Sequence, residues 1–242
     1  VGQINHLAEE GLLKKVIAGH YSLAPRLQKL ALENKVAAYN MPQGCISELF
    51  REIAAHRPGL ITHVGLNTFV DPDLEGGMLN DKAREEGSYV KKVNFNGEEK
   101  LFYPSFPIDV ALIHASYVDT QGNCSMEEEG TLADILPIAQ AAYTSGGKVI
   151  VTVEKSHYVE YGSLDTRFVQ VPGIYIAAIV LVDSDCAMQT NGSYHNEAFS
   201  GEKRIPMSAM DPMPMNARKI IARCCAMELK AGAVVNLGIG MP

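Results

Sequence analysis

The chain has 242 residues, 47% apolar and 20% charged, which is enough to bury one substantial core and excludes intrinsic disorder over most of its length. Its 21 Lys and Arg against 28 Asp and Glu give a net charge of −7, which excludes sequence-independent binding to nucleic acid. The longest apolar stretch, residues 174–182, is about half of the roughly 20 residues that a membrane-spanning helix needs. We therefore expect no nucleic-acid partner and no membrane segment.

Apolar residues between positions 4 and 17 recur at helical spacing and predict a first helix. Asn96-Gly97 predicts a hairpin, whereas residues 71–86, rich in Asp, Gly and Glu, are expected outside the core. The other predicted helices span residues 23–34, 46–55 and 132–143, and residues 41–44 form a loop. The predicted strands span residues 35–40, 89–95, 98–103, 110–115, 148–153 and 175–182. Residues 60–70 are predicted as a further strand together with the segment by which the chain leaves it. This alternation predicts an α/β fold with a mainly parallel sheet covered by helices.

The last part of the chain is interpreted as the opening of a second unit. Asn216 is the predicted N-cap of a helix over residues 216–229. Its apolar side is expected to consist of Ile220, Ile221, Cys224 and Met227, with Cys225 as a further candidate. Residues 233–242 are typical of a buried strand that runs into a glycine loop, with Pro242 where another helix would begin. Because a lone strand cannot bury its own faces, we expect a first domain over residues 1–207, a second that starts with residues 208–242, and a chain truncated at both ends.

Standard catalytic and metal-binding signatures are missing from the sequence. It has no P-loop, dinucleotide fingerprint, nucleophile elbow or zincin motif, and its seven His never fall three or four residues apart on one predicted helix. Its five Cys include no C-x-x-C, so we expect no metal, no disulfide framework and a cytoplasmic location. Adjacent Cys224 and Cys225 leave a redox pair open, although free cysteine is commonly a small buried hydrophobe.

Two loops and one carboxylate are candidates for ligand binding. Gln43 and Gly44 follow a predicted strand and precede a helix, where open α/β sheets place ligand-binding residues; an ordinary βα turn is the alternative. The loop from Gly238 to Pro242 would present backbone N–H groups to negative charge, or would mark only a turn. Glu154 ends a strand and is placed either as a nucleophile or base, or as an ordinary strand-end charge.

Five strings, in order along nearly the whole chain, carry a resemblance. They are residues 41–55, 64–72, 106–112, 198–202 and 235–242, and the first opens with Met41-Pro-Gln-Gly44. Together they resemble the family I coenzyme A transferases, and among these the single-chain acetate and propionate CoA-transferases. The resemblance implies two similar α/β halves. This chain would hold most of the first half and the opening of the second, without the family's N-terminal strand and glycine-rich loop.

The resemblance also implies a reaction. In this family a glutamate attacks the acyl-CoA thioester, which gives a mixed anhydride and free CoA thiolate. The thiolate then attacks the anhydride, which leaves a glutamyl-CoA thioester and releases the first acid. The acceptor acid then reverses these steps. That glutamate would lie beyond Pro242, so no catalytic residue is expected in this chain, which alone is expected to be inactive. Gln43 matches the family's active-site glutamine, and Gly44 would allow a close contact. Residues Gly65, Thr68 and Phe69 match a loop that helps to form the wall of the acyl pocket in the family. Glu154 is not the family's nucleophile; because the two halves are alike, it would be the structural counterpart of that glutamate in the first half.

The predicted function is therefore transfer of coenzyme A between a short-chain acyl-CoA and a carboxylic acid such as acetate. Coenzyme A is a substrate in this reaction, no other cofactor is expected, and the protein is expected to be a homo-oligomer. Two alternatives remain open: a non-catalytic CoA-ester-binding or regulatory half, and an acyl-CoA hydrolase on the same fold. Loss of acyl-CoA without an acceptor acid would indicate the hydrolase.

Overall fold

The computed structural model describes residues 3–190 and 192–238, and the chain divides into two compact units. Unit 1 comprises Val1–Glu202 and unit 2 comprises Lys203–Pro242. This division lies near the predicted boundary between residues 207 and 208. Each unit is described by itself.

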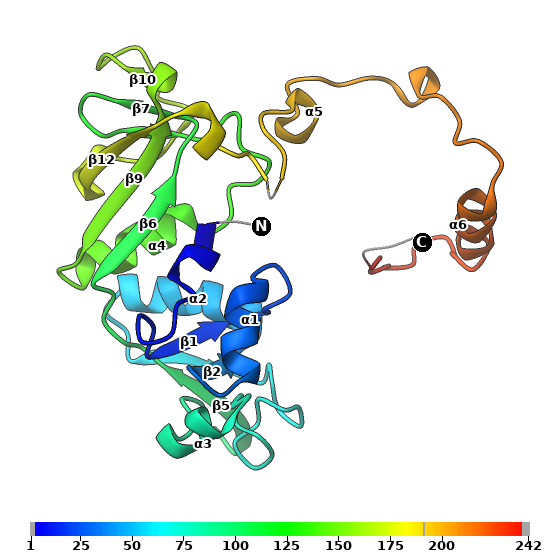
Figure 1. Ribbon diagram of the computed structural model, residues 1–242. Coiled ribbons are helices and arrows are strands. Elements are labelled where there is room, and N and C mark those ends of the chain that lie inside the picture. Colours follow the sequence, from blue (N-terminus) through cyan, green and yellow to red (C-terminus); the bar gives the residue numbers. More distant parts are fainter. Residues whose placement is uncertain (1–2, 191, 239–242) are drawn as a thin grey trace. The chain divides into compact units, whose positions relative to one another are not determined.

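An all-parallel sheet forms one half of unit 1 (Figure 1), in the order β12 (Ile176–Val182), β9 (Lys148–Glu154) and β6 (Val110–His114). Every second residue of β9 points toward helix α4 (Ile135–Thr144), which packs on β6 and β9. The buried core on this face includes Ala111, Ile113, Val149, Val151, Val153, Ala139 and Ala142. Alternating β-branched residues thus build a sheet with one face covered by a helix.

The opposite face of the β6–β9–β12 sheet is open. Val110 and Leu112 of β6 lie on it, 52% and 69% exposed. Val180 of β12 pairs with Thr152 and lies on the same face, 43% exposed. Parallel sheets are ordinarily covered on both faces, so this apolar surface is unusual.

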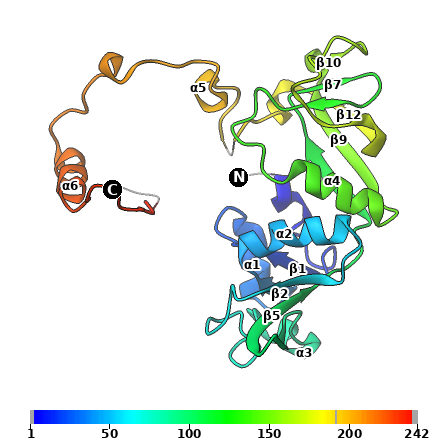
Figure 2. The same ribbon diagram turned by 180° about the vertical axis from the view of Figure 1, so that it is seen from behind.

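A second parallel pair forms the other half of unit 1. Strands β1 (Lys15–Ala18) and β2 (Ala37–Asn40) pair residue for residue, from Lys15 with Ala37 to Ala18 with Asn40. Helix α1 (Pro25–Leu32) connects them, and α2 (Gln43–Ala54) follows β2. Seen from behind, α2 lies along α4, between the β6–β9–β12 sheet and the β1–β2 pair (Figure 2). The two helices therefore join the two halves.

Two further sheets complete unit 1. The antiparallel sheet has the order β3 (Gly59–Thr62), β5 (Glu98–Pro104) and β4 (Lys91–Phe95), and α3 (Asp81–Glu86) precedes β4. The mixed sheet has the order β10 (Tyr158–Val159), β7 (Tyr117–Asp119), β8 (Cys124–Ser125) and β11 (Val169–Val171). The remaining short helices are η1 (Gln3–Leu7), η2 (Lys155–His157), η3 (Gly173–Tyr175), η4 (Ser184–Cys186) and α5 (Glu197–Ser200).

Most predicted elements of unit 1 are confirmed, including the hairpin at Asn96-Gly97 and the α/β class, but three predictions need a full or partial correction. The expected first helix is a single 3-10 turn followed by β1, because residues 15–18 pair with β2. The expected loop at residues 41–44 is shorter, because Pro42 caps a helix that already begins at Gln43. Residues 71–86 lie mostly outside the core as expected, but Asp71 and Ala83 are buried.

Unit 2 contains η5 (Met207–Ala209) and α6 (Ala217–Met227). The predicted cap is confirmed, because the Asn216 side chain accepts a hydrogen bond from the Lys219 N–H at 3.1 Å. The predicted strand is wrong for residues 233–238, which form no strand and find no pairing partner in the described part of the chain. Of the predicted glycine loop from Gly238 to Pro242, residues 239–242 lie outside the described residues.

Each of the five cysteines, all of which lie within the described ranges, is free, so Cys224 and Cys225 form no disulfide. Among the described residues no helix is long and apolar enough to cross a bilayer.

Candidate functional site

The two parallel strands β1 and β2 end side by side and place two loops together. Gly19 follows β1, and Gln43 begins α2 two residues after Met41. A Cβ atom on Gly19 would lie 2.3 Å from Oε1 and 3.1 Å from Cβ of Gln43, so any side chain at position 19 would displace the Gln43 amide. The Gln43 amide is therefore carried at the carboxyl ends of two neighbouring parallel strands, where α/β sheets place ligands.

Asn40, the last residue of β2, holds the loop that follows β1 through side-chain hydrogen bonds. Its Nδ2 donates to the carbonyl oxygens of Ala18 at 3.0 Å and Gly19 at 2.7 Å. The backbone N–H of Met41 also donates to Ala18, at 3.2 Å, which continues the strand pairing. Asn40 thus holds the loop after β1 against the end of β2.

The start of α2 is open to solvent. Gln43 and Gly44 are both exposed, and a Cβ on Gly44 would meet no atom within 4 Å. The first N–H groups of a helix have no acceptor within the helix and carry the positive end of its dipole. An anionic group approaching Gln43 would therefore meet backbone N–H donors as well as the side-chain amide.

The loop that contains the other predicted substrate contacts is tied to the same place. The Gly77 N–H donates to the Phe69 carbonyl at 2.9 Å, and the Asn40 N–H donates to the Gly77 carbonyl at 2.8 Å. Gly77 has a φ of +73°, and a Cβ there would lie 2.7 Å from the Asn40 carbonyl oxygen. Hydrogen bonds therefore link the Phe69 loop to Asn40 and, through it, to Gly19.

Within that loop the predicted residues differ in role. The Thr68 hydroxyl donates to the Gly65 carbonyl at 2.7 Å, so both residues shape the turn itself. Thr68 is exposed and Gly65 half-buried. The Phe69 side chain is 43% exposed and free to contact a ligand. Hydrogen bonds therefore shape the turn at Gly65 and Thr68 and hold Phe69 to Gly77, whereas Gln43 meets the same region through its close approach to Gly19.

A buried carboxylate anchors the loop. Asp71 is 1% exposed and accepts hydrogen bonds from the backbone N–H groups of Asn67 at 2.9 Å and Asp73 at 3.1 Å. Its carboxylate also lies 3.1 Å from Lys92 Nζ. These contacts, the Asn67 hydrogen bond foremost, hold the pKa of Asp71 below its usual value despite burial. The ionised form of Asp71 thus keeps the loop in shape.

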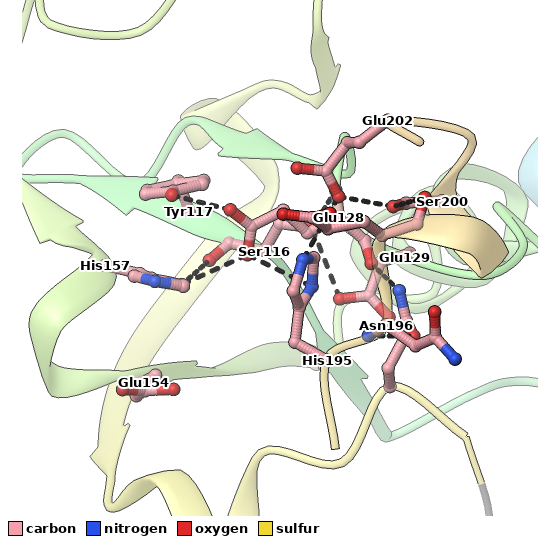
Figure 3. Close-up of polar contacts among 12 residues, drawn as sticks. Ser116, Tyr117, Glu128, Glu129, Glu154, His157, His195, Asn196, Ser200 and Glu202 are labelled. Carbon is pink, nitrogen blue, oxygen red and sulfur yellow. Dashed lines mark hydrogen bonds and ion pairs between the residues drawn. The ribbon is translucent and has the colours of Figure 1, made fainter. Parts of the chain in front are cut away.

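A second polar cluster lies at the carboxyl ends of β6 and β9, and sequence reasoning did not predict it (Figure 3). Tyr117 donates to Glu128 at 2.7 Å, Ser116 donates to Glu129 at 3.3 Å, and His157 Nδ1 lies 3.0 Å from the Ser116 carbonyl oxygen. The remaining members are His114, Glu154, Gln189, His195 and Glu202. The usable signal was that His114 and Glu154 both end buried parallel strands.

Burial shifts the pKa values of two groups at the inner end of this cluster. Burial raises the pKa of Glu129 and lowers the pKa of His114, whose Nε2 lies 3.8 Å from Glu129 Oε1. Burial and the hydrogen bond to Glu128 raise the pKa of Tyr117 to about 12. Within residues 3–190 and 192–238, no group of three or more His, Cys, Asp or Glu side chains could hold a metal ion. Gln189 Nε2 donates to the Glu128 carbonyl oxygen, and His195 Nδ1 lies 3.8 Å from Glu128 Oε2, so the cluster forms a clamp that holds Gln189 and His195 beside Glu128.

Comparison with known proteins gives consistent matches. Residues 2–181 match the family described as coenzyme A transferase. The chain is 45% identical to the caffeate CoA-transferase of Acetobacterium woodii over 99% of this chain and 45% of that protein. It is 39% identical to the acetate CoA-transferase YdiF of Escherichia coli over 98% of this chain and 44% of that protein.

Solved structures agree with these matches. The crystal structure of the Escherichia coli acyl-CoA transferase YdiF superposes with a TM-score of 0.85 and 36% identity, covering 98% of this chain and 44% of that chain. A thioester complex of that protein with CoA matches with the same TM-score and identity, covering 98% of this chain and 46% of that one. This chain spans less than half the length of these relatives. It belongs to the coenzyme A transferase family.

Proposed function

We propose that this chain is the part of a CoA-transferase that binds and orients the reacting carboxyl group, in an enzyme that moves coenzyme A between a short-chain acyl-CoA and a carboxylic acid such as acetate. Family membership supports the reaction class. The observation that carries the proposal is the Gln43 amide, held exposed over Gly19 beside the first turn of α2. This arrangement offers N–H donors to one oxygen of a carboxylate or thioester.

Transfer proceeds through covalent steps on an enzyme glutamate. The carboxylate attacks the thioester carbonyl, CoA thiolate leaves and then attacks the mixed anhydride, and a glutamyl-CoA thioester and the free acid result. The structure of the Escherichia coli relative as a thioester complex with CoA supports this intermediate. We place the nucleophile beyond Pro242, so that residues 1–242 supply donors for the developing oxyanion rather than the attacking group.

Glu154 is left out of this mechanism. It ends β9, and its Oε1 accepts a hydrogen bond from the Ser156 hydroxyl at 2.5 Å. It lines the cavity shared with His114 and His157, at the end of a different sheet from the one that carries Gln43. We assign Glu154 a structural role as the last residue of a core strand.

The test is an acceptor-dependence assay on the full-length protein. Propionyl-CoA is mixed with acetate or with a hydroxycinnamate, and CoA exchange is followed with both substrates varied. Parallel lines in double-reciprocal plots and a CoA adduct on one peptide are expected, with acetate as the preferred acceptor. Acyl-CoA loss without acceptor would replace the proposal by a hydrolase. Binding of the CoA ester without turnover would replace it by a non-catalytic module.

A further inference from the structure

Asn40 stands where three segments of the proposed site meet. Its side-chain amide donates to Ala18 and Gly19 at the end of β1, and its backbone N–H donates to Gly77. Gly77 in turn holds the Phe69 carbonyl. One residue therefore sets the spacing between the loop below Gln43 and the loop that carries Phe69.

The bond to Gly19 determines the room available to Gln43. Because a Cβ on Gly19 would already overlap Gln43 Oε1 at 2.3 Å, the Gln43 side chain rests directly on the Gly19 backbone. A shift of Gly19 by an ångström would therefore move or release the amide above it. The bond from Met41 to Ala18 keeps the two strands paired, but it does not reach Gly19.

We propose that Asn40 is a positioning residue for CoA transfer: its amide holds the Gly19 carbonyl and so keeps Gln43 aimed at the reacting carboxyl group. The inference rests on the proposed function, because it concerns the residue that carries it. Asn40 itself touches no substrate in this scheme. An aspartate of the same shape would have no N–H to donate and would set its oxygens against two carbonyls.

The chain offers a matched control in Asn80. Its Nδ2 also donates to two backbone carbonyls, Ala31 at 2.9 Å and Val36 at 2.8 Å, and it is half-buried like Asn40. Its Oδ1 accepts from the Ala38 N–H, nearer the start of β2. Asn80 therefore performs the same chemistry for the same strand without contacting Gly19.

The experiment is a double-mutant cycle in the full-length protein. Asn40→Ala, Asn40→Asp and Asn80→Ala are made alone and together with Gln43→Ala, and kcat, KM and Tm are measured. Asn40→Ala is expected to lower kcat/KM about 5- to 50-fold, mostly in kcat, and by less than about twofold when Gln43 is already alanine. Asn80→Ala is expected to lower Tm and to change kcat/KM by the same small factor in both backgrounds. Asn40→Ser, which keeps a short donor, is expected to recover part of the loss.

Amide hydrogen exchange over residues 19–24 gives a second readout that does not need activity. Faster exchange in Asn40→Ala than in Asn80→Ala supports the fastening of the Gly19 loop. The inference is overturned if exchange in Asn40→Ala is unchanged, or if Asn40→Ala lowers kcat/KM by the same factor with and without the Gln43 side chain. Either result leaves the proposed function intact as long as the wild type transfers CoA. A wild-type protein that folds but transfers no CoA overturns the proposed function, and the role assigned to Asn40 with it.

Discussion

Replacing Gln43 by alanine removes the side-chain amide and leaves the fold around it. Gln43 is exposed in the first turn of α2, and its side chain rests on the Gly19 backbone rather than in the core. Alanine is also a good helix former, so the start of α2 should tolerate the change. We therefore expect the Tm of Gln43→Ala to move by only a few degrees.

The activity should respond far more than the stability. A lost hydrogen bond to a group that is desolvated on binding costs about 1–3 kcal/mol. Since each 1.36 kcal/mol is tenfold in rate, kcat/KM for CoA transfer in the full-length protein should fall about 5- to 150-fold. The assay is initial-rate transfer between propionyl-CoA and acetate, with Tm measured on the same preparation.

Two further variants separate chemistry from structure. Gln43→Glu keeps the length of the side chain but sets a negative charge against the incoming carboxylate, so it should be at least as slow as Gln43→Ala. Gln28→Ala changes an exposed glutamine on α1 and should leave the rate unchanged. A well-folded Gln43→Ala protein with near-normal kcat/KM would refute the role given to this residue, as would a variant that loses stability but keeps its activity per folded molecule.

Three other predictions follow from the packing. Gly19→Ala should push the Gln43 side chain aside and lower kcat/KM about 10- to 100-fold with little change in Tm; an unchanged rate would mean that the amide position does not matter. Val151→Ala removes two buried carbons from a side chain that is 0% exposed and should cost about 2 kcal/mol in urea unfolding. Because the pKa of Asp71 is lowered in the folded state, its contribution to stability is present above the pKa of an unfolded aspartate and is lost as pH falls through the folded value. The free energy of unfolding should therefore fall less steeply with decreasing pH in Asp71→Asn than in wild type. Equal slopes would contradict the lowered pKa of Asp71 in the folded state.

Elements with a strong local pattern could be predicted from the sequence. Alternating valines predict β9, and Asn96-Gly97 predicts its hairpin without knowledge of distant residues. Val16 and Ile17 belong to the apolar residues whose spacing predicts a helix between positions 4 and 17, and only the pairing of residues 15–18 with β2 makes this segment a strand. The strand predicted at residues 233–238 failed for the converse reason, since its apolar run has no partner in the described part of the chain.

The candidate site shows the same limit more sharply. Gln43 could be predicted from its position after a strand, and the family resemblance added its expected role. Gly19 and Asn40 could not, because their importance lies in hydrogen bonds and a close approach between separate loops. The clamp around Glu128 draws on several segments, so no motif in one stretch of sequence describes it.

The open face of the β6–β9–β12 sheet changes what a melting experiment on this chain measures. Leu112, Val110 and Val180 are exposed on a surface of the kind that proteins usually cover. Any apolar surface that covers this face, including that of a second copy, binds the folded form better than the unfolded one and stabilises it by mass action. The apparent stability of the 242-residue chain should therefore rise with its concentration. A Tm measured at one concentration would then report the free energy of association together with that of folding.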